Sequence, residues 1–368
     1  MIKPVRRTLK KNGSVTEKTE PLSFATQLIA WQKQAGRHDL PWQRTHDAYR
    51  IWLSEIMLQQ TQVSTVIPYY QTFLEQFPTV KHLAAASLDQ VLSLWAGLGY
   101  YARARNLHRC AQQVVQEHEG IFPTQARVLI TLPGIGRSTA AAIAVFSSGE
   151  QAAILDGNVK RVFCRYFGID GLPTTKAVEN QLWAIAEREL PTQDIEAYTQ
   201  GLMDFGATFC TRTRPRCADC FAQTQCVAAQ TNRAHELPTP KPRTKLPQRQ
   251  VHVLLYRFQD QIYLEQRPEK GIWGGLWSLP EQAIAPNVRS LKKQGLAGID
   301  SCTALPVIQH TFTHFRLDIL PWRITLNAPT ASSRFGAGQW IKLEDLARYG
   351  LPKPIKALIE QIVQAEAL

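Results

Sequence analysis

The spacing of apolar residues changes once along this chain, and the change divides it into two parts. From residue 22 to about residue 229, apolar positions recur with helical periodicity, and segments such as 83–98 and 140–147 are rich in Ala and Leu. These segments lack the alternating β-branched runs that are typical of strands. We therefore predict an all-α domain over residues 22–229.

Beyond residue 250 the pattern is that of strands. Residues 251–256 form a compact apolar run, and residues 261–266 follow after a short polar turn. Residues 315–319 alternate between apolar and polar side chains, which is typical of a half-buried strand. Residues 354–367 have the pattern of a closing helix with proline in its first turn. We predict an α+β domain over residues 250–368.

Two polar segments flank these domains. Residues 1–21 hold six basic residues and little apolar material, which predicts a flexible basic tail. Residues 230–249 carry four prolines and five Lys or Arg residues, a composition that is typical of a stiff, extended and solvated linker.

Composition indicates a polyanionic partner. The chain has 42 Lys and Arg against 30 Asp and Glu, which gives a net charge of +12. A balance of this kind commonly reflects contact with nucleic acid, although it says nothing about the fold. No apolar run is long enough for a signal peptide or a membrane span. We therefore expect a cytoplasmic protein, acting as a monomer, without a membrane partner.

Four of the seven cysteines lie within 17 residues, as Cys210-x6-Cys217-x2-Cys220-x5-Cys226. Thiolates gathered so closely can bind zinc or the irons of an iron–sulfur cluster, and the spacing alone permits both metals. Two disulfides are the alternative, which fits a small secreted domain better than a chain of this length. The x6 gap carries three arginines, which predicts either a phosphate-contacting loop or simply a solvated basic one.

The segment Thr131–Ala140 lies between two helical patterns and contains Gly134 and Gly136. Two glycines separated by one residue allow a tight turn whose amides point outward at the start of the next helix. Such a helix N-terminus can bind a phosphate without reading sequence. The alternative is a plain helix–helix turn.

Two carboxylates stand in settings that suggest chemistry. Asp156 follows an apolar pair and precedes a glycine, so we expect it to cap the helix that begins near Asn158. Glu55 is the only ionisable residue in a run with Ile, Trp, Leu and Met on both sides. Burial among such neighbours would raise its pKa, as a general acid requires. A Glu on the wet face of an amphipathic helix is the alternative.

Together, the glycine hairpin, Asp156, the segment around Glu55 and the cysteine pattern resemble the helix-hairpin-helix DNA glycosylase superfamily. Within it, nearly the whole chain is similar to MutY-type adenine DNA glycosylases. The resemblance implies a helix-hairpin-helix glycosylase domain with a [4Fe-4S] cluster loop, ligated by Cys210, Cys217, Cys220 and Cys226. Lyases of the endonuclease III type have a Schiff-base lysine where this chain has Ser138, so the resemblance implies a monofunctional glycosylase.

The same resemblance implies roles for individual residues. Glu55 would protonate N7 of an adenine flipped out of duplex DNA, and Asp156 would stabilise the oxocarbenium-like sugar. Gln60 and Tyr100 match residues that fill and wedge the DNA around the lesion. Asn158 and Lys160 would line the pocket and contact the DNA backbone. The DNA would contain adenine opposite 8-oxoguanine or guanine.

The second domain resembles the Nudix fold. Residues 274–300 contain no Glu-rich box for a divalent metal, so hydrolysis there is not expected. In MutY-type enzymes this domain recognises 8-oxoguanine through a Phe-Ser-His loop, and the matching residues are Phe312, Thr313 and His314. Threonine keeps the hydroxyl of serine and adds a methyl group.

Two other functions fit part of the sequence. A bifunctional glycosylase/lyase of the endonuclease III type would share the hairpin and the cluster, but Ser138 and the long second domain count against it. A non-catalytic, DNA-binding iron–sulfur protein, such as a redox sensor, would have no need for Glu55 in an apolar setting.

Overall fold

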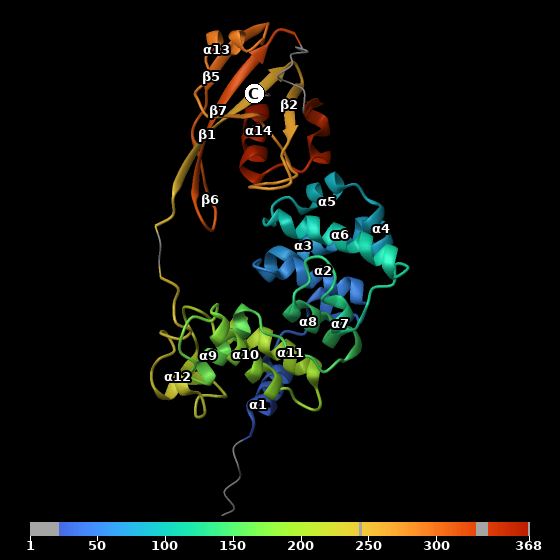
Figure 1. The fold of residues 1–368 in the computed structure, drawn as a ribbon, viewed down its shortest axis with the longest axis vertical. Coiled ribbons are helices and arrows are strands. Elements are labelled where there is room, and N and C mark those ends of the chain that lie inside the picture. Colours follow the sequence, from blue (N-terminus) through green and yellow to red (C-terminus); the bar gives the residue numbers. More distant parts are fainter. Residues whose placement is uncertain (1–21, 243–244, 329–337, 367–368) are drawn as a thin grey trace, which may run out of the picture.

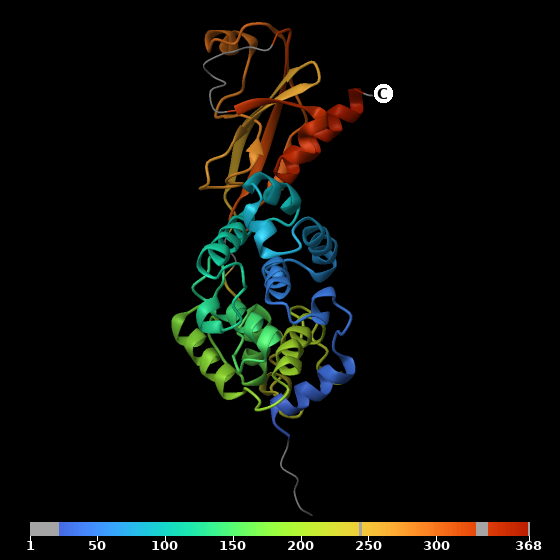
Figure 2. The ribbon, with the colours of Figure 1, turned by 90° about the vertical axis from the view of Figure 1, so that its right-hand side faces the viewer.

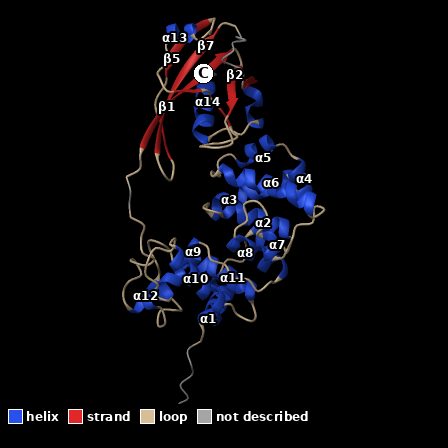
Figure 3. Cartoon of the chain, viewed as in Figure 1, coloured by secondary structure: helices blue, strands red, loops and turns tan. Residues whose placement is uncertain are grey.

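The computed structural model describes residues 22–242, 245–328 and 338–366, so the predicted basic tail lies outside the described residues. Figure 1 shows two domains stacked along the long axis, with a helical domain below and a sheet domain above. An extended segment runs along one side and connects them. Among the described residues, strands occur only in the upper domain (Figure 3), as the change in pattern near residue 250 predicts. Within the described ranges, no helix has the length and apolar character needed to cross a membrane.

The helical domain agrees with the predicted all-α fold. Its elements are α1 (Phe24–Ala35), η1 (Pro41–Arg44), α2 (Ala48–Leu58), α3 (Val63–Gln76), α4 (Val80–Ala85), α5 (Leu88–Trp95), α6 (Tyr101–Glu117), α7 (Ala126–Leu129), α8 (Arg137–Ser148), α9 (Gly157–Tyr166), α10 (Lys176–Arg188), α11 (Ile195–Asp204), η2 (Phe205–Phe209), η3 (Cys217–Asp219) and α12 (Val227–Gln230).

Side-chain caps fix several of these helix starts. Ser23, Asp47, Thr79 and Ser87 each accept a backbone N–H from the first turn of the helix that follows. These bonds satisfy donors that have no partner within the helix. Ser87 also separates α4 from α5, because its capping box begins a new helix within an apolar run.

Helix α8 lies between two lobes of the helical domain. Ala140, Ile143 and Ala144 belong to a core shared with α2–α6, whereas Ala141, Ala142 and Val145 belong to a core shared with α1 and α9–α11. The helix is therefore buried on two sides, which only short side chains permit at close helix–helix approach. The two lobes leave a cleft between them, and the site lies there.

The second domain is built on one mixed sheet. Its elements are β1 (Gln248–Phe258), β2 (Gln261–Gln266), β3 (Trp277–Ser278), β4 (Glu281–Gln282), α13 (Val288–Lys293), β5 (Ile299–Ala304), β6 (Ile308–Thr311), β7 (Arg316–Leu326), β8 (Gly338–Lys342), η5 (Leu343–Arg348) and α14 (Lys353–Glu366). The main strand order is β3-β2-β1-β7-β5, with β1 and β7 parallel and the other pairs antiparallel.

Both faces of the central strands are covered. Leu317 and Ile319 pack in the same core as residues of α14, while Ile324 and Leu326 pack with Leu291 of α13 on the other side. Asp318, which alternation alone would place in solvent, is 7% exposed and accepts N–H groups from the side chains of Gln248 and Gln309. The half-buried strand that we predicted is therefore more completely buried than its polar positions indicate.

The predicted linker is shorter than its composition indicates. Leu237 is 2% exposed and packs with Ala228 and Ala234. Its carbonyl accepts the Nε–H of Arg165, with 2.9 Å between nitrogen and oxygen. At the other end, β1 already begins at Gln248. The segment rich in proline and charge is therefore longer than the connection between the domains, because the buried Leu237 and its hydrogen bond with Arg165 fix the first part of that segment to the helical domain.

The two domains touch through α5 and α6. Trp277 donates its indole N–H to Asp89 Oδ1 at 3.2 Å, and Arg105 donates to the carbonyl of Gly274. Leu92 of α5 lies against the backbone at Gly350, where an added Cβ would lie 2.9 Å from its Cβ. Figure 2 shows the teal helices around α5 directly beneath the sheet domain. The contact holds the second domain against one end of the helical domain.

Candidate active site

Helix α2 carries Glu55 to the wall of the cleft between the two lobes. The helix starts at the cap of Asp47 and buries Ile51, Trp52 and Met57 in the first lobe. Glu55 is partly exposed, on the side of α2 that faces the cleft. Glu55 therefore lies on the wall of the cleft and not on the outer, fully exposed face of an amphipathic helix.

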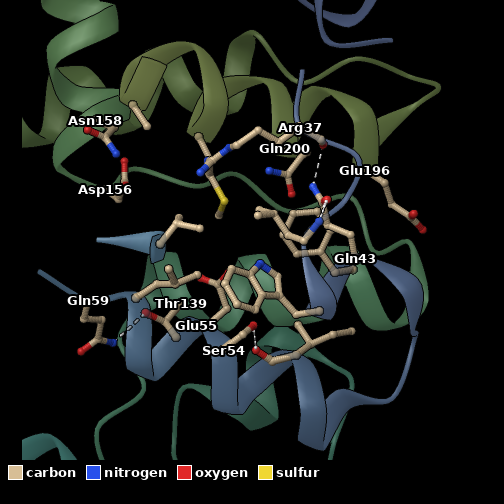
Figure 4. A pocket seen from close by; sticks show the side chains of 18 of the residues that line it. Arg37, Gln43, Ser54, Glu55, Gln59, Thr139, Asp156, Asn158, Glu196 and Gln200 are labelled. Carbon is tan, nitrogen blue, oxygen red and sulfur yellow. Dashed lines mark hydrogen bonds between the residues drawn. The ribbon is translucent and has the colours of Figure 1, made fainter. Parts of the chain in front are cut away.

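Asp156 reaches the same cleft from the other lobe. It is the N-cap of α9, as predicted, and its Oδ1 accepts the N–H of Val159 at 2.8 Å. Figure 4 shows Asp156 and Asn158 on one side of the pocket and Glu55 on α2 across from them. Residues separated by about a hundred positions in sequence thus face one another.

The cleft has a volume of about 1550 Å³. That is larger than the 300–1,000 Å³ typical of small-molecule pockets, and it is open enough to admit a nucleotide that remains attached to a longer chain. Among the predicted site residues, the structure brings together Glu55, Gln60, Ser138, Asp156 and Asn158 on its lining.

The two carboxyl groups experience different surroundings. Burial, and then the negative charge of Asp156, raises the pKa of Glu55 to about 8. Burial also raises the pKa of Asp156, but the N–H groups of Val159 and Asn158 and the charges of Arg161 and Lys160 oppose that rise. Glu55 receives no such help in holding a negative charge, so it is the better proton donor of the pair.

The glycine hairpin adjoins this site. Gly134 has φ +79°, and an added Cβ would lie 2.8 Å from the Cβ of Asn106, so the turn requires glycine there. Gly136 is the N-cap of α8. Two residues later, the hydroxyl of Ser138 accepts the N–H of Leu155 at 2.9 Å, which ties the hairpin helix to the segment that ends at Asp156.

Gln60 lines the cleft, whereas Tyr100 is not among the lining residues. Both residues have left-handed backbones, with φ of 58° and 50°, and Tyr100 is 43% exposed. Lys160 does not line the pocket as we expected, because its ammonium lies 2.7 Å from Glu179 Oε1 on the next helix.

Several polar residues of the cleft carry no local signal in the sequence. Gln43 and Gln200 line it on the side away from Asn158 (Figure 4). Gln200 and Arg37 are held by the carboxylate of Asp204, which is fully buried. Side-chain amides are common at any surface position, so no local signal distinguished these two glutamines.

All four clustered cysteines line one pocket beside α9, and none of the seven cysteines forms a disulfide. Within the described ranges, no three His, Cys, Asp or Glu side chains converge as ligands of a single metal ion. Arg165 donates to the carbonyls of Thr211 and Arg212 at 2.7 and 3.1 Å, so it holds the loop that carries the three exposed arginines.

In the second domain, Phe312, Thr313 and His314 form the turn between β6 and β7. The ring of Phe312 stacks on Phe315, with centroids 4.6 Å apart, and so is committed to packing. Thr313 and His314 are exposed at the tip. In Figure 1 this hairpin extends below the sheet toward the helical domain.

Comparison with known proteins agrees with both halves of the chain. Residues 53–188 match the family model for the HhH-GPD superfamily base excision DNA repair protein, and residues 251–361 match that for the NUDIX domain. The structure of a thermostable thymine-DNA glycosylase is similar to the helical domain, with TM-score 0.52 and 28% identity over 56% of this chain and 95% of that one. The fold and the cleft therefore define a base excision repair glycosylase of the helix-hairpin-helix class, followed by a Nudix domain.

Relatives that match nearly the full length of this chain narrow the class of glycosylase to a single family. An adenine DNA glycosylase of Buchnera aphidicola is 37% identical over 92% of this chain and 97% of its own length. The human adenine DNA glycosylase is 33% identical over 89% of this chain and 71% of its own length. The chain belongs to the adenine DNA glycosylase family, enzymes that remove adenine from DNA in base excision repair.

Proposed function

We propose that this enzyme hydrolyses the N-glycosidic bond of adenine mispaired with 8-oxoguanine or guanine in duplex DNA, and that it leaves the DNA strand intact. The observation that carries the proposal is the placement of Glu55 and Asp156 on facing walls of one cleft, beside Ser138. The raised pKa of Glu55 suits a group that must be protonated near neutral pH.

In this proposal Glu55 donates its proton to N7 of the flipped-out adenine, which makes the base a better leaving group. As the glycosidic bond breaks, positive charge develops on the sugar, and the carboxylate of Asp156 stabilises it from the opposite wall. A water molecule then adds to C1′ of the sugar and passes a proton to the carboxylate of Glu55, which restores the enzyme. The N–H of Val159 fixes the orientation of that carboxylate. Asn158, also on the lining, completes the polar surface beside the sugar.

The proposed absence of lyase activity rests on the residue at position 138. An amine there could attack the sugar and form a Schiff base, whereas the hydroxyl of Ser138 is not an amine and already accepts the N–H of Leu155. Among the described residues, no lysine lines the cleft.

DNA would be held mainly through its phosphates. The N-terminus of α8, opened by Gly134 and Gly136, offers backbone N–H groups and the positive end of a helix dipole. Lys160, although paired with Glu179, lies on the next helix, α9, and could reach the DNA backbone. Exposed Arg212, Arg214 and Arg216 would add charge, in agreement with the net charge of +12.

We also propose that Cys210, Cys217, Cys220 and Cys226 hold a [4Fe-4S] cluster. Proteins of this superfamily generally carry an iron–sulfur cluster. The four thiols fit it because they line one pocket beside α9, and four thiolates can each bind one iron of such a cluster. The cluster would supply a rigid anchor for the arginine loop, which Arg165 also holds.

The second domain would read the base opposite the adenine. Thr313 and His314 are exposed at the tip of a hairpin that extends toward the helical domain, while Phe312 anchors the hairpin. Discrimination between 8-oxoguanine and guanine would come from hydrogen bonds at this tip, each contributing about 1–3 kcal/mol.

The deciding experiment uses duplexes with adenine opposite 8-oxoguanine. We expect free adenine and an abasic site, with strand breaks only after treatment with base. Borohydride should trap no protein–DNA adduct. Strand breaks without base, together with a trapped adduct, would show a lyase and contradict the proposal. A duplex with adenine opposite thymine serves as the control and should stay intact.

A further inference from the structure

The side chain of Arg103, in the first turn of α6, connects two loops that are distant in sequence. Its Nη1 donates to the carbonyls of Ile56 and Met57, both at 2.9 Å, and to that of Gln59. Its Nη2 donates to Thr61 Oγ1 at 3.0 Å and to the carbonyl of Leu98 at 3.2 Å. One guanidinium therefore binds the end of α2 and the turn before α6.

Each of these loops contains one residue other than glycine with a left-handed backbone. Gln60 lies between two partners of Arg103, Gln59 and Thr61, and has φ 58°. Tyr100 has φ 50° and is the N-cap of α6, without a side-chain cap. Such conformations cost free energy in residues other than glycine and persist only where the surroundings impose them.

The position of Arg103 is unfavourable by local rules. A cation near the N-terminus of a helix is repelled by the helix dipole. Burial of the guanidinium also lowers its pKa to about 10. The guanidinium lies 5.4 Å from the ring centres of both Trp95 and Tyr100, so one of its neighbours is the exposed aromatic ring itself. Because the helix dipole and burial both disfavour a cation at this position, we attribute the placement of Arg103 to the hydrogen bonds that it makes with the two loops.

We propose that Arg103 is a positioning residue for DNA distortion: its guanidinium holds Gln60 and Tyr100 in their left-handed conformations, so that both side chains enter the duplex in a fixed arrangement. The inference rests on the proposed wedging role of these two residues. Because the same group caps α2 one turn after Glu55, the wedge and the general acid keep a constant spacing.

The test uses the full-length enzyme and a mispaired duplex with 2-aminopurine beside the target adenine. Stopped-flow fluorescence reports unstacking on binding, before excision. Arg103→Gln removes the fork of donors, and Arg103→Lys keeps the charge but not the fork. Arg109→Gln is the matched control, because Arg109 is exposed on the same helix and donates to Asn106 within that helix.

We expect both Arg103 variants to lose most of the unstacking signal and to excise mispaired adenine at least about tenfold more slowly, while the control behaves as wild type. Adenine opposite an abasic site is already unpaired and needs little distortion. Its excision should therefore change less than about threefold, because little unstacking energy is needed.

Two results would overturn the inference. One is unstacking by Arg103→Gln at the wild-type amplitude. The other is an equal loss of excision on both substrates, which would indicate a purely structural role. Gln60→Ala and Tyr100→Ala separate this failure from that of the proposed function. If these two variants unstack DNA normally, the wedging role is wrong, and the inference is wrong with it.

Discussion

Glu55 and Asp156 face each other across the cleft, and the charge of Asp156, added to burial, raises the pKa of Glu55 to about 8. Burial also raises the pKa of Asp156, but backbone N–H groups and nearby cations oppose that rise, because they favour the charged form of its carboxyl group. Two carboxyl groups in one cleft can therefore take different protonation states, which the proposed roles require.

The first prediction concerns pH. A general acid works in its protonated form, and the protonated fraction of Glu55 falls as pH rises through about 8. We expect kcat/KM for adenine excision to stay high below that pH and to fall about tenfold per unit above it. Single-turnover rates across pH 6–10 measure this. A rate that stays constant to pH 10 would contradict the role of Glu55.

The second prediction is that Glu55→Gln lowers the rate of adenine excision and raises the stability of the fold near pH 8. The amide delivers no proton, so excision should fall by roughly 10²–10⁴-fold with little change in DNA affinity. Because the pKa of Glu55 is higher in the folded than in the unfolded chain, wild-type stability falls as pH rises from about 4.5 to about 8. Glu55→Gln lacks this loss.

Thermal unfolding at pH 5 and pH 8 tests the stability half of this prediction. The variant should unfold at a higher temperature than wild type at pH 8, and the difference should shrink at pH 5. Equal unfolding temperatures at both pH values would show that Glu55 is not held in a desolvated setting. Asp47→Asn, at the exposed cap of the same helix, is a useful comparison.

The third prediction concerns Ser138. Ser138→Ala removes the acceptor of the N–H of Leu155, a residue that is 4% exposed, and an unsatisfied buried donor costs about 1–3 kcal/mol. Because Leu155 precedes Asp156, we expect slower excision as well as a lower unfolding temperature. DNA affinity, measured by fluorescence anisotropy, should change little. Ser148→Ala, near the other end of α8, is the control and should leave excision unchanged.

The fourth prediction concerns the cysteine loop. The purified enzyme should be yellow-brown and contain about four irons per chain. Cys217→Ser should weaken DNA binding more than it disturbs the N-terminal helices, because the loop carries three exposed arginines. Cys302→Ser, in the second domain, should change neither iron content nor binding. One zinc and no iron in the metal analysis would disprove the cluster.

The fifth prediction separates recognition of the base opposite the adenine from catalysis of adenine excision. Replacing both Thr313 and His314 by alanine leaves Phe312 in place, so the hairpin should stay folded. The variant should excise adenine opposite guanine as wild type does, while its preference for 8-oxoguanine falls by roughly tenfold, the value of about one good hydrogen bond. Lys292→Ala on α13, at the far end of the domain in Figure 1, is the control. An unchanged preference would exclude the tip from recognition.

Local patterns in the sequence determined the two domains and part of the chemistry. Helical and strand periods, the cap at Asp156 and the glycine turn at Gly134 depend on neighbours a few residues away, so they can be read from the chain. The cysteine spacing is local in the same sense. Composition was a weaker guide to the ends of the linker, because the polar segment after residue 230 includes Leu237, which is buried in the helical domain.

Only the tertiary structure decided which distant residues meet. The pairing of Glu55 with Asp156, the ion pair of Arg37 with Asp204, the salt bridge that turns Lys160 from the cleft and the bonds from Arg103 to the end of α2 all join separate elements of the chain. Burial and electrostatic coupling arise when the lobes pack against α8, and no window of the sequence contains both partners. The residue types were visible in the chain, but their pKa values and strained backbones follow from contacts that exist only in the folded protein.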